Sequence, residues 1–146
     1  MDRGALALCL IVLLLLATSC QGSTKADRAV IENGRLAYME NCASCHGANG
    51  EGQPDWKIPR PDGSYSAPPH DSTGHTWHHG DGLLFHYVKY GGASLEIPAF
   101  VSGMPAFAGK LSDEEIKAVI LYLKTLWGAK EREFQAQVSE QDPFQR

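Results

Sequence analysis

Hydrophobic residues recur with a helical period in three segments of this chain. The clearest segment spans 112–127, where Ser112 and Glu115 fit a capping box immediately before the apolar positions. Two further segments, 27–41 and 81–90, show the same period. Because no segment has a convincing strand pattern, we predict an all-α fold with three main helices. The core-facing residues of the last helix are Ile116, Val119, Ile120, Leu123 and Leu126.

Candidate caps and loops delimit these helices. Asp27 and Asp81 are the candidate N-caps of the first two helices. The stretch 47–80 is rich in Gly, Pro, Asp and Ser and has no sustained period, so we expect a long ordered loop there. Residues 93–110 return to loop, and 128–146 is a polar C-terminal tail with at most one frayed helix. A loop as long as 47–80 is uncommon in a compact domain unless it wraps around something.

The N-terminus has the layout of an export signal. Arg3 is followed by an apolar run over 5–17, which is too short for a confident transmembrane helix, so residues 1–19 are predicted to be a signal peptide. Small residues before Cys20 resemble a bacterial lipobox, although Ala17 stands where leucine is usual. This favours lipidation of Cys20. The alternative is ordinary signal cleavage that leaves Cys20 as a plain thiol.

The remaining length fits one compact domain. Of 146 residues, 20–26 are small and polar, as expected of a tether, and 27–127 form the predicted domain. The formal net charge of −4 argues against nucleic acid as a partner and permits a basic redox partner. Of four cysteines, Cys9 leaves with the signal and Cys20 is the lipidation candidate. A disulfide framework is therefore disfavoured.

The other two cysteines form the motif Cys42-Ala43-Ser44-Cys45-His46. In an exported chain this motif indicates covalent attachment of a c-type haem, with one thioether from each cysteine and the histidine as an iron ligand. A redox dithiol needs a βαβ context, and a structural zinc site needs two more ligands at suitable spacing. The chain has neither pattern, so we predict one covalent haem c.

Met104 is the leading candidate for the second iron ligand. It lies in the loop segment Gly103-Met104-Pro105-Ala106-Phe107, shortly before the last helix. A methionine thioether raises the reduction potential of a haem relative to a second imidazole. Met39 falls on the first helix, where packing is the simpler role. The alternative for Met104 is a plain loop hydrophobe, which a position between glycine and proline disfavours.

These motifs give the chain a resemblance to class I c-type cytochromes over about residues 27–127. The matching features are Cys42 to Gly47, Gly103 to Phe107, and Leu111 to Ile116 leading to Tyr122. The resemblance implies a cytochrome c fold, with helices and long loops wrapped around one covalent haem. It also implies that the first and last helices cross beside the haem. Gly34, Tyr38 and Tyr122 fit that crossing.

The resemblance further implies a proline carbonyl that accepts a hydrogen bond from the proximal histidine. Pro68 or Pro69 is the expected equivalent, although His70 stands where the family often has leucine. Trp77 is a candidate donor to a haem propionate. An alternative role for Trp77 is that of a large aromatic side chain covering the haem edge.

A histidine-rich loop departs from the family pattern. It contains His70, His75, His78 and His79, and His86 follows in the second helix. Four imidazoles within ten residues suggest either a copper or zinc site or competition with Met104 for iron. The simpler interpretation is a haem-covering loop whose histidines are exposed or hydrogen-bonded, and we favour it.

The predicted function is single-electron transfer without bond chemistry on a substrate. The expected partners are redox proteins such as an oxidase, a reductase or a dehydrogenase. The expected location is the periplasm or the outer face of the cytoplasmic membrane, through the lipid on Cys20. Two other classes stay open. One is an enzyme in which Met104 dissociates and the open iron reduces peroxide or another small molecule, which the lack of an obvious distal acid/base pair disfavours. The other is a binding module built on the histidine loop.

Overall fold

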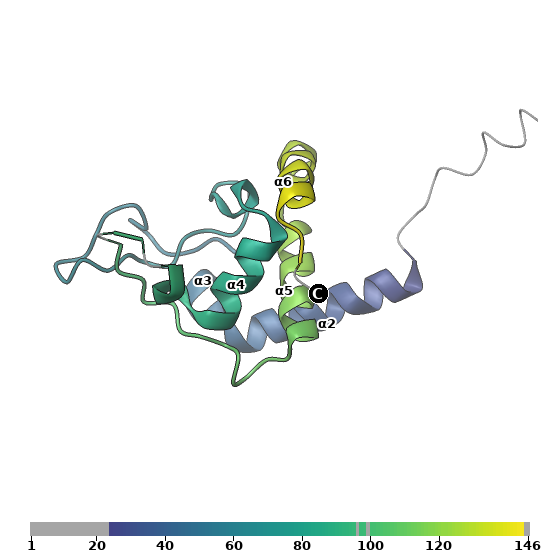
Figure 1. The fold of residues 1–146 in the computed structure, drawn as a ribbon, viewed down its shortest axis with the longest axis horizontal. Helices are drawn as coiled ribbons and strands as arrows, with labels where there is room; N and C mark the ends of the chain where they lie inside the picture. Colours follow the sequence, from purple (N-terminus) through teal and green to yellow (C-terminus); the bar gives the residue numbers. More distant parts are fainter. Residues whose placement is uncertain (1–23, 96, 99, 145–146) are drawn as a thin grey trace, which may run out of the picture.

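The computed structural model describes residues 24–95, 97–98 and 100–144. Within them, five α-helices and two short 3-10 helices follow in chain order (Figure 1). The predicted all-α fold class is confirmed, since an isolated bridge between Ser64 and Val101 is the sole β pairing in this part of the chain. The helices are α2 (Lys25–Asn41), α3 (Ala43–His46), η1 (Thr76–His78), α4 (Asp81–Tyr90), η2 (Gly92–Leu95), α5 (Asp113–Lys124) and α6 (Ala129–Gln141).

Helix α2 begins earlier than the sequence predicted. Thr24 is its N-cap, and Asp27 occupies the third helical position. The Thr24 hydroxyl accepts from the Asp27 N–H at 3.1 Å, and the Asp27 carboxylate accepts from the Thr24 N–H at 2.9 Å. These reciprocal bonds form a capping box, which satisfies two helix-end donors at once. Assigning Asp27 as the cap was therefore wrong by three positions, and residues 25–26 of the predicted tether are helical.

Helix α4 also differs from its predicted start. Gly80 is the N-cap, and Asp81 is the first helical residue, with a buried side chain. The Asp81 carboxylate is used elsewhere, since it accepts from Lys124 of α5 at 2.7 Å and from Gln135 of α6 at 2.7 Å. In contrast, the predicted capping box of α5 is confirmed, because Ser112 and Glu115 exchange both bonds.

Two apolar clusters make up the core, and α5 contributes to both. Helix α5 crosses α2 (Figure 1). The crossing is close because a Cβ on Gly34 would lie 2.0 Å from the Ala118 carbonyl oxygen. The first cluster, on the α2 side, contains Tyr38, Val119, Tyr122, Leu123 and Trp127. The second, between α4 and α5, contains Phe85, Phe107, Leu111, Ile116 and Ile120.

The segment predicted as a polar tail is largely a packed helix. Gln135 of α6 is only 1 % exposed, and its side-chain amide donates to the carboxylate of Asp81 and the carbonyl of His79. Beyond α6, the Asp142 carboxylate accepts from the N–H of Leu83, and the Phe144 ring packs against the second cluster. Sequence periodicity missed this helix because it is attached mainly through polar contacts.

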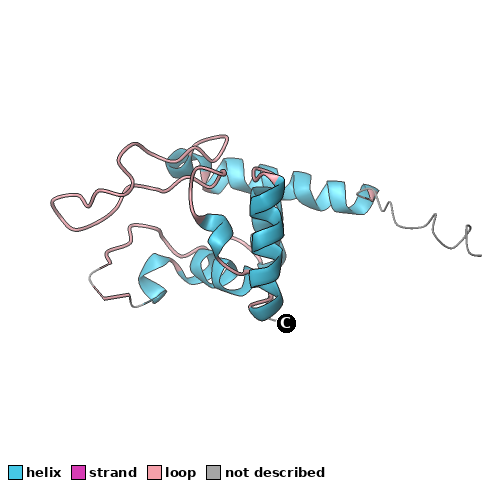
Figure 2. Cartoon of the chain, turned by 90° about the horizontal axis from the view of Figure 1, so that it is seen from above, coloured by secondary structure: helices cyan, strands magenta, loops and turns pink. Residues whose placement is uncertain are grey.

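Long loops occupy the side of the molecule away from the start of α2 (Figure 2). The stretch 47–80 is the predicted ordered loop, interrupted only by η1 near its end. Among the described residues, no helix is both long enough and apolar enough to cross a membrane. The predicted signal peptide and Cys20 lie outside the described residues.

Candidate haem site

The Cys-x-x-Cys-His motif starts where α2 ends. Cys42 caps α2, and its N–H donates to the Tyr38 carbonyl at 2.8 Å. The N–H groups of Cys45 and His46 then donate to the Cys42 carbonyl at 3.1 and 2.9 Å, which makes the motif one short helical turn, α3. The buried Tyr38 hydroxyl ties this turn down by donating to the Gly47 carbonyl at 2.7 Å. The motif is thus held as a single rigid turn.

The His46 imidazole is buried and has a fixed orientation. His46 is only 7 % exposed, and its Nδ1 atom lies 3.0 Å from the Pro68 carbonyl oxygen. Because a carbonyl can only accept, Nδ1 carries the hydrogen and Nε2 keeps its lone pair for a metal. Burial lowers the pKa of His46, and the bond to Pro68 opposes part of this shift. The geometry favours Pro68 over Pro69 as the acceptor.

The two cysteines of the motif have different surroundings. Cys42 is half-buried and Cys45 is exposed. Burial raises the pKa of the Cys42 thiol to about 11, so this group is a neutral thiol near pH 7. A redox dithiol requires a reactive thiolate, and the environment of Cys42 opposes its formation. The surroundings of Cys42 therefore weaken the redox-dithiol interpretation.

His70 packs directly on the predicted proximal ligand. The rings of His46 and His70 stack with their centroids 4.0 Å apart. His70 Nδ1 lies 2.8 Å from the Thr76 hydroxyl, and its carbonyl accepts from the Trp127 indole at 2.7 Å. Burial lowers the pKa of His70 well below its usual range, and the neighbouring His46 adds to that effect. His70 is thus an uncharged packing residue where the family often has leucine.

Met104 lies in a different part of the structure from the motif turn. Its half-buried side chain packs against the second apolar cluster. Its carbonyl accepts from the Gly92 N–H at 3.1 Å, which fixes the loop to the end of α4. Met39, the alternative methionine, is 41 % exposed on α2. The structure therefore leaves Met104 as the methionine with apolar surroundings.

Trp77 provides a direct test of whether the site fits a haem. Its ring packs against the first cluster, but its indole Nε1–H is buried and has no partner within the described part of the chain. A buried donor without an acceptor costs free energy, so such a group indicates a missing partner. The carboxylate of a haem propionate would supply that acceptor. The unpaired Trp77 indole and the free lone pair on Nε2 of His46 therefore both fit a bound haem.

The histidines of the loop make aromatic contacts with one another and with neighbouring rings. His75 stacks on Trp56, with nearly parallel rings 5.4 Å apart, and meets His79 edge-on at 5.4 Å. His78 packs against the rings of Trp77 and Phe134. Across residues 24–95, 97–98 and 100–144, no three side chains of His, Cys, Asp or Glu are grouped to hold a metal ion. The simpler interpretation of this loop, as an aromatic covering layer, fits these contacts better.

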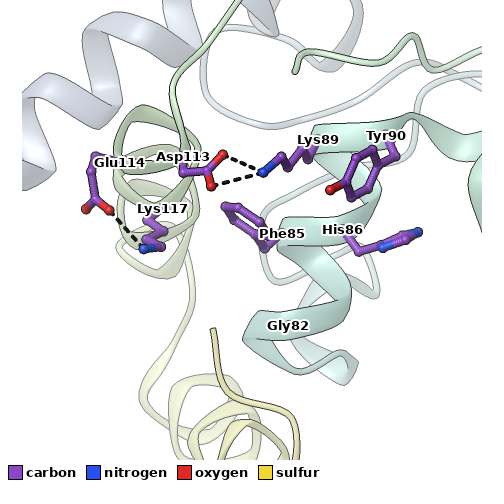
Figure 3. Close-up of a pocket in the computed structure, with 8 residues that line it drawn as sticks. All are labelled: Gly82, Phe85, His86, Lys89, Tyr90, Asp113, Glu114 and Lys117. Atoms are coloured by element: carbon purple, nitrogen blue, oxygen red, sulfur yellow. Dashed lines mark hydrogen bonds and ion pairs between the residues drawn. The ribbon is translucent and has the colours of Figure 1, made fainter. Parts of the chain in front are cut away.

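A small polar cavity lies between α4 and the start of α5 (Figure 3). Lys89 bridges it by pairing with both carboxylate oxygens of Asp113, at 2.7 and 2.9 Å. Lys117 pairs with Glu114 at 2.9 Å on the same rim. None of the predicted site residues lines this cavity.

Sequence reasoning missed several residues that support the predicted ligands. Thr76 holds His70, while Ser102 and Tyr87 contact the Met104 segment. Serine, threonine and tyrosine are common in loops and helices, so nothing in the linear sequence marked them. Only the folded arrangement brings them next to the motif residues.

Comparison with known proteins places the chain in a family. The profile of the family described as Cytochrome c matches residues 31–127. A cbb3-type cytochrome c oxidase subunit CcoP of Azospirillum brasilense is 33 % identical over 105 residues, covering 71 % of this chain and 31 % of that protein. A subunit FixP of Bradyrhizobium sp. (strain ORS 278) is 29 % identical over 99 residues, covering 66 % and 28 %. The chain thus spans about a third of the curated relatives it matches.

A solved structure shares the fold. Cytochrome cL of Methylophaga aminisulfidivorans superimposes with a TM-score of 0.54 at 18 % sequence identity, covering 90 % of this chain and 88 % of that one. Fold and site together define a helical electron-transfer protein of the haem c class. The chain belongs to the cytochrome c family. Its cofactor is covalently attached haem c, and Cys42 and Cys45 fit the attachment motif of that family.

Proposed function

We propose that this protein is a monohaem carrier of single electrons between exported or membrane-bound respiratory proteins. Cys42 and Cys45 would hold the haem through thioether bonds, and His46 and Met104 would bind its iron. The observation that carries the proposal is the buried His46 ring, whose Nδ1 is held 3.0 Å from the Pro68 carbonyl oxygen. That contact leaves Nε2 as the coordinating atom.

The bound haem supplies the redox chemistry, because its iron accepts and releases one electron. The protein supplies ligands, orientation and exclusion of water. Pro68 makes the His46 imidazole more basic through the Nδ1–H bond, which tunes the reduction potential. Trp77 donates its unpaired indole N–H to a haem carboxylate. No substrate bond is made or broken, so the protein acts as a carrier and not as an enzyme.

The partner class follows from the relatives. Two relatives are named as subunits of cbb3-type cytochrome c oxidases, so an oxidase is the leading partner, with a reductase or a dehydrogenase as electron donor. Because the match covers about a third of those proteins, the chain acts either as a separate carrier or as a subunit of a larger redox complex.

Export and anchoring complete the proposal. Residues 1–19 act as the signal, and a lipid on Cys20 holds the domain at the outer face of the cytoplasmic membrane. Helix α2 starts at Lys25, so 20–24 form a tether shorter than the sequence suggested. The functional unit comprises 27–127, and α6 packs onto it through Gln135. Membrane fractionation of a Cys20→Ser variant, compared with wild type, tests the anchor.

The decisive experiment is an optical spectrum of the mature protein, produced with a haem-attachment system, in both oxidation states. We expect low-spin haem c and, in the oxidised form, the far-red methionine-to-iron band. Met104→Ala should abolish that band, while the control Met39→Ala, on the exposed face of α2, should keep it. A high-spin spectrum, or a band that survives Met104→Ala, would contradict the proposed ligation.

A further inference from the structure

The Met104 segment is fixed to the C-terminal end of α4 by backbone hydrogen bonds. The last carbonyl groups of a helix have no donors within the helix, and here the segment after Met104 supplies them. The Phe107 N–H lies 3.2 Å from the Val88 and Lys89 carbonyl oxygens, and the Ala108 N–H donates to Lys89 at 3.0 Å. These contacts hold the segment downstream of Met104.

Upstream of Met104, a single side chain takes over this function. The Ser102 hydroxyl oxygen accepts from the Met104 N–H at 3.2 Å and lies 3.0 Å from the Tyr87 hydroxyl of α4. A hydroxyl has two lone pairs and one hydrogen. Ser102 can therefore accept a hydrogen bond from Met104 and also either donate to or accept from the Tyr87 hydroxyl. The Ser102 hydroxyl therefore links the backbone N–H of Met104 to the Tyr87 side chain of α4.

Close packing leaves little freedom at this link. A Cβ on Gly92 would lie 1.7 Å from the Ser102 hydroxyl oxygen and 2.6 Å from the Tyr87 hydroxyl. Gly92 also donates its N–H to the Met104 carbonyl at 3.1 Å. Both backbone polar groups of Met104 are thus hydrogen-bonded, the N–H to Ser102 and the carbonyl to Gly92. The Tyr87 hydroxyl contacts the Ser102 hydroxyl in the same place.

We propose that Ser102 is a positioning residue, through which Tyr87 holds Met104 in place as an iron ligand. The inference rests on the ligand role of Met104 in the proposed function. Removing the Ser102 hydroxyl leaves the Met104 N–H and the Tyr87 hydroxyl without this partner. The main-chain contacts of Gly92 and Phe107 remain, so the fold survives while the methionine is held less tightly.

The test uses the haem-loaded full-length mature protein and imidazole as the displacing ligand at fixed pH. Loss of the far-red band after mixing reports displacement of Met104. Ser102→Ala should accelerate displacement about tenfold, the effect of losing one partly buried hydrogen bond. Tyr87→Phe should give a smaller acceleration, because Met104 keeps its bond to Ser102.

Ser94→Ala is the matched control. The Ser94 hydroxyl donates to the Gly91 carbonyl at 2.6 Å in the same turn and makes no hydrogen bond to Met104. Equal displacement rates in Ser102→Ala and Ser94→Ala would overturn the proposal. A wild-type protein without the far-red band would instead overturn the ligand role of Met104, so the two failures are distinguishable.

Discussion

The Nδ1 atom of His46 lies 3.0 Å from the carbonyl oxygen of Pro68, a residue 22 positions further along the chain. The backbone between them is closed by two further bonds, from the Gly52 N–H to the His46 carbonyl at 2.7 Å and from the Gln53 N–H to the Ala67 carbonyl at 2.9 Å. The loop thus places the Pro68 carbonyl beside the His46 imidazole. The tautomer of His46 therefore depends on a contact between residues that are far apart in the sequence.

Gly52 offers a way to disturb that contact from outside the motif. It has φ of 68°, and a Cβ there would lie 2.5 Å from Pro69 N and 2.7 Å from the Pro68 carbonyl carbon. Gly52→Ala should push the Pro68 carbonyl away from His46. A weaker bond makes the imidazole a poorer donor to iron, so the reduction potential should rise. Redox titration of the haem-loaded protein measures this shift.

Gly63→Ala is the control for Gly52→Ala. Gly63 has φ of 80°, yet a Cβ there would meet only a Val101 methyl group at 3.6 Å. Both variants should lose about 1 kcal/mol of stability from the left-handed backbone alone. Equal reduction potentials in the two variants would show that the Pro68 carbonyl does not tune the haem.

The unpaired Trp77 indole predicts that Trp77→Phe destabilises the haem-loaded protein more than the apoprotein. Trp77→Phe removes a buried donor that has no partner within the described chain, so the apoprotein should lose little stability. The haem-loaded protein should lose about 1 kcal/mol with the bond to the haem carboxylate. Trp127→Phe is the contrast, because its indole donates to His70 in the protein itself and the loss should appear in both forms. Denaturant titration of each form measures the effect.

Gly34 sets how closely α2 and α5 approach. A Cβ there would lie 2.0 Å from the Ala118 oxygen and 3.0 Å from the Val119 nitrogen, and both atoms belong to the α5 backbone. Gly34→Ala should therefore force the helices apart and cost about 3 kcal/mol, the upper range for overpacking. The exposed neighbour Asn33→Ala should change stability little. Equilibrium unfolding compares the two variants. Similar unfolding midpoints would mean that α2 and α5 can move apart to accept the added methyl group at little cost in stability.

Asp142 acts as the N-terminal cap of α4 from the far end of the chain. The N-cap residue Gly80 has no side chain, and Asp142 accepts from the Leu83 N–H through its carboxylate at 2.8 Å and from the Gly82 N–H through its carbonyl at 2.9 Å. Asp142→Ala should cost about 1 kcal/mol, as for loss of an N-cap. Glu140→Ala, an exposed acidic residue two positions earlier, should cost nothing measurable in the same unfolding assay.

The histidine loop should destabilise the fold as pH falls. The pKa values of His75 and His79 are lowered by burial and by neighbouring histidines, so the unfolded chain binds more protons than the folded one below about pH 6.5. Stability should therefore decrease as pH falls through that value. The double substitution His75→Gln and His79→Gln should reduce this dependence. Thermal unfolding between about pH 7.5 and about pH 5, the range in which histidine titrates, measures this pH dependence. If the slope of stability against pH is the same in the double variant as in wild type, the acid sensitivity belongs to other groups.

The sequence was sufficient for features that depend on local pattern. The capping box at Ser112, the helical period of α5 and the motif ending at His46 are short-range signals, because each depends on residues a few positions apart. The polar attachment of α6 gave no such signal. Gln135 looks like a surface residue in the sequence, and it is buried because Asp81 and His79 lie opposite it in the fold.

The sequence by itself determined the three main helices within a few residues, the attachment motif for haem c and, through the motif and its resemblance, the family. The tertiary structure decided which proline carbonyl faces His46, that His70 stacks on it, and that the Trp77 indole has no partner within the described chain. The physical reason is range. Helical periods and motifs are set by neighbours in the chain, whereas hydrogen-bond partners and burial depend on which distant segments fold against each other.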